Sequence, residues 1–327
     1  MTRVGLTGGS GLVGGALLKK LIERGDEVSA LARTDAAAAK LAERGATTFR
    51  GDVLDEEALV RGLEGCELLY HVAGVNALCT PDPAGMMRVN VDGAALAVRA
   101  AARAGVRRVV LTSSAASLGE VKGTIGNEDS AHRGSYMSVY EQSKREGELA
   151  AIAEAKRQGI EIVSINPSSV QGPGRAGGTG KILIAYLNGR LKAFVDTTIS
   201  IVDIDDCVEG HILGAERGRD GERYVLNSAT LTSLEALEVV STISGVRHDV
   251  RLIPPAAAKA VATAVELVFR VRRKHAPLCR EMITTMLHGH RYDGSRAARE
   301  LGVRYTPVED TFRRTIEWAR AEGLVNG

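Results

Sequence analysis

Apolar and polar positions alternate in a regular order over the first half of the chain. Short apolar runs rich in Val, Ile and Leu are followed by longer segments in which Ala and Leu recur at helical spacing. Strands separated by helices form βαβ units and a parallel sheet, and continuous apolar runs indicate that helices cover both faces. The expected strands are residues 3–7, 27–32, 47–51, 67–73, 107–113 and 160–166, and the expected helices are residues 11–24, 36–44, 56–63, 85–104 and 140–157.

The alternation stops after Asn166, where Pro167 and a glycine-rich stretch at 172–180 indicate a loop-rich transition. The later part is mixed, with short strands and then mainly helix. Its expected elements are strands near 199–202 and 222–226 and a helix near 205–217.

The sequence therefore predicts an α/β protein with two parts. Residues 1–166 should form a Rossmann-type, doubly wound parallel sheet that binds NAD(P). Residues 167–327 should form a smaller, mixed, mainly helical C-terminal substrate lobe, although segments at about 199–228 could return to the main sheet.

Composition narrows the range of partners. The net charge is +2 and aromatic residues make up 4% of the 327 residues, which argues against a nucleic-acid partner. Residues 256–271 are apolar, but Lys259, Glu266 and Arg270 interrupt them, so we expect an amphipathic helix and no membrane span. The basic run at 270–275 is expected to be an exposed helix end.

The cysteine and histidine patterns suggest no structural cross-link or metal site. The four cysteines lie far apart without a C-x-x-C pair, so we expect neither a disulfide framework nor zinc. No signal segment precedes the first strand, and a cytoplasmic location is the resulting expectation. His288 and His290 lack a third ligand at metal spacing, so we expect a solvated helix end and no metal site.

The first expected strand runs into a glycine-rich turn from Thr7 to Gly14, which satisfies G-x-G-x-x-G. Such glycines permit a tight turn and close approach of the backbone to a pyrophosphate, which then sits on free N–H groups at a helix N-terminus. The position between a strand and a helix is the context that this motif requires. The turn residues expected to bind the cofactor are Gly8, Ser10, Gly11, Leu12 and Val13.

The end of the second strand favours NADP over NAD. An acidic residue usually binds the adenosine ribose of NAD at this point, and Ala32 stands there instead. Arg33 and Lys40 could bind the additional phosphate of NADP. Asp35 is the counter-evidence, since a small loop shift could bring it to the ribose.

Tyr140 and Lys144 are the candidate catalytic pair. They lie four residues apart in an expected helix and share one face. We expect the ammonium to lower the pKa of the phenol, so that Tyr140 can exchange a proton with a carbonyl or alcohol oxygen. Ser113 and Ser114 end the preceding strand, where ligands of doubly wound sheets bind. We select Ser114 as the third catalytic residue, and Ser113 stays an alternative.

Together these motifs resemble the extended short-chain dehydrogenase/reductase superfamily over nearly the whole chain. Within it, the chain is most similar to dihydroflavonol reductases and 3β-hydroxysteroid dehydrogenases of the NAD-dependent epimerase/dehydratase family. The resemblance implies that Tyr140 and Lys144 also contact the cofactor, that Asn90 lies behind the active site and that His71 is structural. It further implies cofactor contacts from Asp52 and Val53 near adenine, from Val72, Ala73 and Gly74 beside the ring, and from Pro167, Ser169 and Val170 near the carboxamide.

The sequence leaves three functions open. The favoured one is an NADP(H)-dependent oxidoreductase that reduces a ketone or aldehyde of a small, moderately apolar molecule, or oxidises the alcohol. The second is a sugar or nucleotide-sugar epimerase with tightly bound NAD(P), although residues 196–201 hold no cation for a substrate diphosphate. The third is a non-catalytic NAD(P) sensor. The resemblance also allows a homodimer, because family members often pair through helices like those at 85–104 and 140–157.

Overall fold

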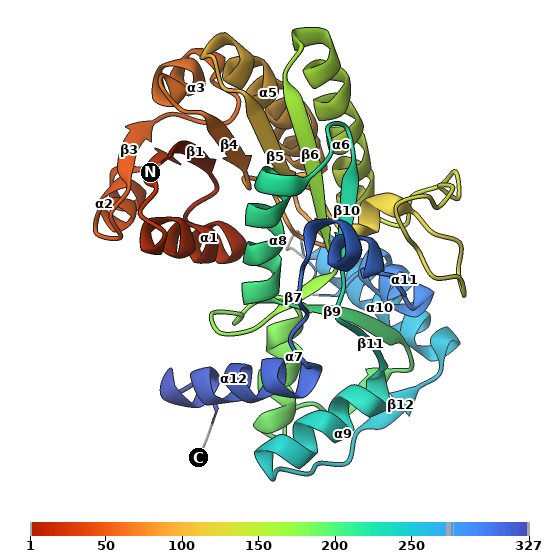
Figure 1. The fold of residues 1–327 in the computed structure, drawn as a ribbon. Helices are drawn as coiled ribbons and strands as arrows, with labels where there is room; N and C mark the ends of the chain where they lie inside the picture. The colour runs from red at the N-terminus through yellow and green to blue at the C-terminus, as the bar shows by residue number, and fades with distance from the viewer. Residues whose placement is uncertain (1, 273–275, 277, 326–327) are drawn as a thin grey trace.

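A seven-stranded sheet forms the centre of the molecule in the computed structural model, which describes residues 2–272, 276 and 278–325 (Figure 1). All neighbouring strands of this sheet are parallel, in the order β10-β6-β5-β4-β1-β2-β3. The prediction of a Rossmann-type parallel sheet is confirmed. Its strands are β1 (Arg3–Thr7), β2 (Glu27–Ala32), β3 (Thr47–Arg50), β4 (Leu68–His71), β5 (Arg108–Thr112), β6 (Glu161–Pro167) and β10 (Arg223–Leu226).

Helices cover both faces of the sheet, as continuous apolar strands require. One buried cluster joins the sheet to α1, α2 and α8, and a second joins it to α3, α5 and α6. These helices are α1 (Leu12–Glu23), α2 (Asp35–Ala42), α3 (Glu56–Leu63), α5 (Gly93–Arg103), α6 (Val139–Gln158) and α8 (Ile204–Arg217).

The helix expected at 85–104 is interrupted. It consists of α4 (Pro83–Met87), a π-helical turn at Arg88–Asp92 and then α5. Asn90 lies in that turn, where its side chain bonds the backbone of Val75 and the hydroxyl of Ser143. A π-turn is a frequent mark of a functional site. Here it directs one polar side chain toward both the segment after β4 and α6.

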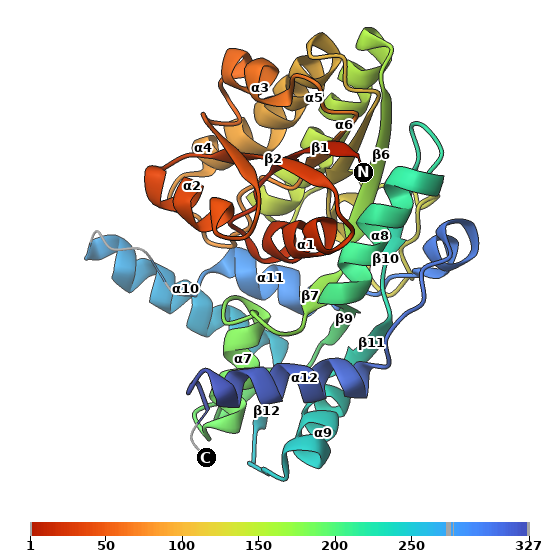
Figure 2. The same ribbon diagram turned by 60° about the vertical axis from the view of Figure 1, so that its left-hand side comes forward.

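The C-terminal part carries two smaller sheets below the main one (Figures 1 and 2). β10 pairs with β6 in the main sheet, whereas β9 and β11 pair with each other beside β7. The division of the chain at residue 166 stays a prediction. The remaining elements are β7 (Ser169–Gln171), α7 (Thr179–Leu187), β8 (Ala193–Val195), β9 (Thr198–Asp203), β11 (Ala229–Thr232), α9 (Ser233–Ser244), β12 (Arg251–Ile253), α10 (Pro255–Val271), α11 (Arg280–His288) and α12 (Val308–Ala321).

A disulfide between Cys79 and Cys279 joins the loop after β4 to the start of α11. The expectation that the cysteines stay unpaired is therefore wrong for these two, whereas Cys66 and Cys207 are free and buried. The spacing of the cysteines gave no sign of the bond, because 200 residues separate the partners and only the fold brings them together.

α10 confirms the helix expected at 256–271. Among the described residues, no helix combines the length and the apolar character that crossing a membrane requires. Val271 and Arg272 of the basic run at 270–275 are exposed, as expected, whereas residues 273–275 lie outside the described residues, so the exposure of the whole run stays a prediction.

Candidate active site

The turn after β1 is shaped to receive a phosphate group. Gly8 has a φ of +76°, and a Cβ on it would lie 2.6 Å from the Ala73 nitrogen. A Cβ on Gly14 would overlap the Gly8 carbonyl. Gly11 caps α1 without a side-chain hydrogen bond, which leaves the first N–H groups of the helix, from Leu12 and Val13 onward, without intrahelical partners. These residues therefore fit a dinucleotide pyrophosphate.

The ends of β2 and β3 supply the charges expected near the adenosine. Arg33 and Lys40 are exposed, and Asp35 pairs with Arg50, whose Nε lies 3.3 Å from Asp35 Oδ1. Arg50 also approaches the Ala32 carbonyl at 3.5 Å. Sequence reasoning missed Arg50, although the pairing of β3 with β2 brings it opposite Ala32 and makes it findable once the strand register is known.

Asp52 and Val53 follow β3 at the same edge of the sheet. The Asp52 carboxylate accepts the N–H of Leu54 at 3.0 Å. The Val53 side chain is buried in the cluster that includes α5. Any contact of Val53 with an adenine would therefore involve its backbone or the outer edge of its side chain.

The segment after β4 is fixed by hydrogen bonds from two sides. Thr7 Oγ1 lies 3.0 Å from His71 Nδ1 and accepts the Ala73 N–H at 3.2 Å. Asn90 holds Val75 through both its N–H and its carbonyl. Burial, with a smaller effect of Lys144, lowers the pKa of His71 to about 3, so the ring is neutral. Val72, Ala73 and Gly74 are thereby held beside the glycine turn.

Ser114, Tyr140 and Lys144 meet at the carboxyl end of β5. Burial raises the pKa of Tyr140, and a hydrogen bond with Ser114 opposes that rise. Lys144 Nζ donates to the Thr112 carbonyl at 2.7 Å. Burial also lowers the pKa of Lys144 to about 8, against the opposing effect of Glu148. The expected lowering of the Tyr140 pKa by Lys144 is thus not found, because burial raises this pKa and the opposing effects come from Ser114 and Arg175.

Ser113 contacts a different residue of α6. Its hydroxyl donates to the buried carboxylate of Glu148, which also accepts from Ser117 at 2.7 Å and from Asn166 at 2.8 Å. An ion pair of 2.9 Å with Arg223 connects the same carboxylate to β10. Glu148 is a residue that sequence reasoning missed. Its signal was an acidic residue one turn after Lys144 on the same helix.

Pro167, Ser169 and Val170 follow one another from the end of β6 into β7. The Ser169 hydroxyl lies 3.3 Å from Thr179 Oγ1. The loop between β7 and α7 carries Arg175, whose charge acts to lower the pKa of Tyr140. Its Nε is buried without a hydrogen-bond partner. Arg175 was not expected, because no local pattern connects that loop with α6.

Comparison with known proteins identifies the family of this arrangement. Residues 4–227 match the model of the NAD dependent epimerase/dehydratase family. The chain belongs to this family. The predicted membership of the extended short-chain dehydrogenase/reductase superfamily is confirmed, and the protein is an NAD(P)-dependent enzyme of the extended type.

Members of the family with reductase names align along most of the chain. A Synechocystis protein provisionally named dihydroflavonol 4-reductase is 30% identical over 98% of this chain and 95% of its own. Cinnamoyl-CoA reductase 2 of Arabidopsis thaliana is 31% identical over 72% of this chain and 76% of its own. The crystal structure of gox2253 superimposes with a TM-score of 0.85 at 30% identity and covers both chains completely. These likenesses support reductase- or epimerase-type activity with NAD(P).

Proposed function

We propose that the protein is an NADP(H)-dependent reductase of a ketone or aldehyde on a small, moderately apolar molecule, able to oxidise the corresponding alcohol in reverse. The observation that carries the proposal is the placement of three side chains: Ser114 follows the end of β5, and Lys144, one helical turn from Tyr140, donates from Nζ to the Thr112 carbonyl of β5 at 2.7 Å. All three stand at the carboxyl end of β5, the edge at which parallel α/β sheets bind ligands.

The two hydroxyl groups would hold the substrate. Ser114 donates a hydrogen bond to the carbonyl oxygen, and Tyr140 gives that oxygen its proton. A raised pKa keeps Tyr140 protonated at neutral pH, which suits carbonyl reduction. NADPH, when bound, supplies the hydride that reaches the carbonyl carbon. The Lys144 ammonium orients the nicotinamide ribose and stabilises the phenolate left on Tyr140.

NADP is the proposed cofactor because three cations surround the end of β2. Arg33 and Lys40 are exposed there, and Arg50 reaches the same edge from β3. Arg50 also pairs with Asp35, the acidic residue that would otherwise be available to an NAD ribose. A phosphate on the ribose would bind guanidinium groups through charge-assisted hydrogen bonds.

The relatives support a carbonyl substrate without identifying it. Two of them are named reductases of a dihydroflavonol and of cinnamoyl-CoA. Residues 196–201, at the start of β9, contain no Lys or Arg that could hold a sugar diphosphate, which argues against a nucleotide sugar. The cofactor would therefore be expected to leave after each turnover.

A carbonyl panel tests the proposal. Purified protein is assayed for oxidation of NADPH and NADH with aromatic ketones, aldehydes and 3-oxo compounds, and Tyr140→Phe serves as the background. We expect at least one carbonyl to be reduced with NADPH in preference to NADH. Mass spectrometry of the denatured protein checks for retained nucleotide. Stoichiometric nucleotide together with an inactive panel would contradict the proposal and favour an epimerase.

A further inference from the structure

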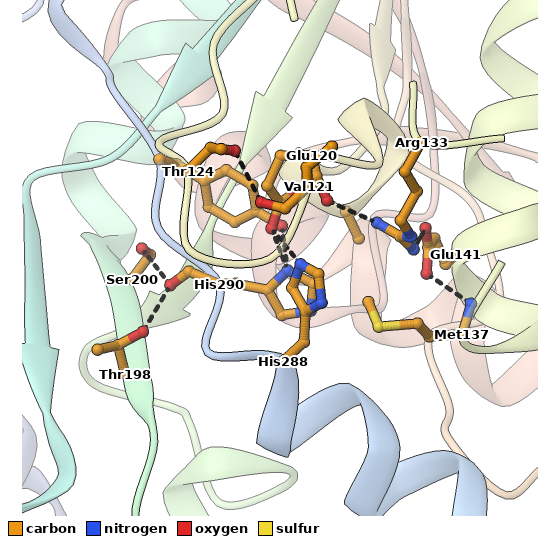
Figure 3. Close-up of polar contacts among 12 residues, drawn as sticks. Glu120, Val121, Thr124, Arg133, Met137, Glu141, Thr198, Ser200, His288 and His290 are labelled. Atoms are coloured by element: carbon orange, nitrogen blue, oxygen red, sulfur yellow. Dashed lines mark hydrogen bonds and ion pairs between the residues drawn. The ribbon is translucent and has the colours of Figure 1, made fainter. Parts of the chain in front are cut away.

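Three side chains that are far apart in the sequence converge outside the catalytic triad. Glu120 lies in the loop after β5, while His288 ends α11 and His290 follows it. One oxygen or nitrogen atom from each of the three lies within 4.8 Å of the others. Figure 3 shows the two imidazole rings side by side, with nitrogens facing the Glu120 carboxylate. The expected solvated helix end is therefore wrong.

The cluster is buried and incompletely hydrogen-bonded. The side chains of Glu120 and His288 are 1% and 7% exposed, and that of His290 is 18% exposed. His290 Nδ1 lies 2.6 Å from Glu120 Oε1, but Glu120 Oε2 and the Nε2 atoms of both histidines are buried without a hydrogen-bond partner. Unsatisfied buried polar atoms carry a desolvation cost, and three together in one place call for a missing ligand.

The donor set and spacing match a transition-metal ion. Two imidazoles and one carboxylate are ligands typical of zinc, which binds them at about 2.0–2.2 Å. Tetrahedral geometry then separates two ligand atoms by about 3.3 Å. His288 Nε2 lies 3.4 Å from Glu120 Oε1, so this pair already has that separation. Glu120 Oε2 and the Nε2 atoms of His288 and His290 leave each of the three residues with one buried, unpartnered atom that could ligate an ion.

Surrounding contacts hold the three residues in position. Arg133 donates to the Glu120 carbonyl at 3.1 Å, and the same arginine pairs with Glu141. Ser200 and Thr198 on β9 donate to the His290 carbonyl at 3.1 and 3.3 Å (Figure 3). Fixed surroundings of this kind orient metal ligands and raise metal affinity. The Tyr292 hydroxyl, 3.0 Å from His290 Nδ1, belongs to the same shell.

We propose that Glu120, His288 and His290 bind one divalent transition-metal ion of the zinc class, with a fourth position left for water or another ligand. The ion would fasten the loop after β5 to the segment that follows α11. Both segments neighbour Tyr140, since Arg133 connects Glu120 to Glu141 and Glu281 on α11 accepts the Val139 N–H at 2.9 Å. The proposal is independent of the reductase reaction, because none of the three ligands takes part in it.

Metal binding to the untagged full-length protein tests the site directly. After chelation and dialysis, the protein is equilibrated with Zn²⁺ or Co²⁺ near neutral pH. We expect one ion per chain, visible absorption of four- or five-coordinate Co²⁺, and a higher melting temperature with Zn²⁺. Wild-type protein without a stoichiometric ion or a Co²⁺ band would overturn the proposal, and this outcome depends on no variant.

Variants assign the ion to the cluster. Glu120→Gln and the double variant His288→Gln/His290→Gln should lose the Co²⁺ band and the thermal shift, whereas Tyr292→Phe should weaken binding by about 10–100-fold. His248→Gln removes an exposed histidine outside the cluster and should bind as wild type does. Circular dichroism checks that each variant is folded. Equal binding by folded wild type and the folded double variant would locate the ion elsewhere and overturn the assignment.

Discussion

The two sides of the candidate active site are built in different ways. On the Rossmann side, each functional residue lies within a few positions of the strand or helix that holds it, as Ser114 does after β5 and Gly8 does after β1. On the C-terminal side, the disulfide and the hydrogen bonds join residues that are far apart in the sequence. The disulfide joins Cys79 to Cys279, which are 200 residues apart. His290 contacts Glu120, 170 residues away in the sequence. The Val139 N–H donates to Glu281, 142 residues away.

This difference indicates that the Rossmann side holds the reacting groups, whereas the C-terminal side determines how the substrate binds. A parallel sheet with helices on both faces is rigid, so it can hold a proton donor in fixed geometry. Side chains attached through loops can vary in position and identity without disturbing that sheet, and binding specificity is often found there. We therefore expect substitutions on the Rossmann side to change turnover and breaks on the C-terminal side to change stability and substrate affinity.

The largest expected effect comes from Tyr140→Phe. The substitution removes the proton donor and keeps the ring, so kcat for carbonyl reduction should fall by about 10²–10⁴-fold. Loss of the hydrogen bond with Ser114 should change the free energy of unfolding by only about 1 kcal/mol. Steady-state kinetics and thermal melting measure the two quantities. Tyr136→Phe, at an exposed tyrosine in the preceding loop, is the matched control; unchanged turnover in Tyr140→Phe would refute the role of Tyr140.

Removing the disulfide tests the expectation that changes on the C-terminal side affect stability more than turnover. A Cys79→Ser/Cys279→Ser variant loses a cross-link over 200 residues, and the chain-entropy argument gives a loss of about 5 kcal/mol in the free energy of unfolding. Turnover at saturating substrate should change far less than in Tyr140→Phe. Denaturant unfolding with and without reductant measures the effect.

The Cys79→Ser/Cys279→Ser variant is also the control for other effects of the reductant. Because it has no bond to break, adding reductant should not change its unfolding transition. A reducing cytosol, the compartment expected from the sequence, would keep the two cysteines as thiols. A wild-type transition that is identical with and without reductant would show that the bond does not contribute to stability.

Cofactor preference should depend on the ends of β2 and β3. Arg33→Ala and Arg50→Ala each remove a charge-assisted contact to the additional phosphate of NADP, so KM for NADPH should rise by about 10–100-fold. KM for NADH should change little in Arg33→Ala. Arg247→Ala, at an exposed arginine paired with Glu238 in the C-terminal part, is the control. Equal losses for both cofactors would remove the preference for NADP.

The same contrast explains what the sequence could and could not predict. Strand periodicity predicted the six strands of residues 1–166 within a few positions, because each pattern is local. It also suggested Ser114 and Tyr140, since strand ends and helix turns are local features. Predicting the role of Arg50 would have required the strand register. Predicting Arg175, the disulfide, and Glu120 as the third ligand beside His288 and His290 would have required the whole fold. No pattern along the chain links residue 120 with residue 290.

The smallest expected effect is a pH dependence that belongs to the Rossmann side alone. The pKa of Lys144 is lowered to about 8, so its ammonium is charged below that pH and neutral above it. Since kcat/KM for NADPH reports ionisations of the free enzyme, it should fall to half near that pH and by about tenfold one unit higher. Lys144→Arg keeps its positive charge throughout this range, so its kcat/KM for NADPH should fall only at a higher pH than that of the wild type. This shift is expected even if the variant is slower at every pH. If both proteins lost kcat/KM over the same pH range, the titrating group would be one other than Lys144. The same pH profile can be measured after the disulfide is reduced. If the fall of kcat/KM at alkaline pH then disappeared, the C-terminal side would influence the ionisation on the Rossmann side, and the two sides would not be independent.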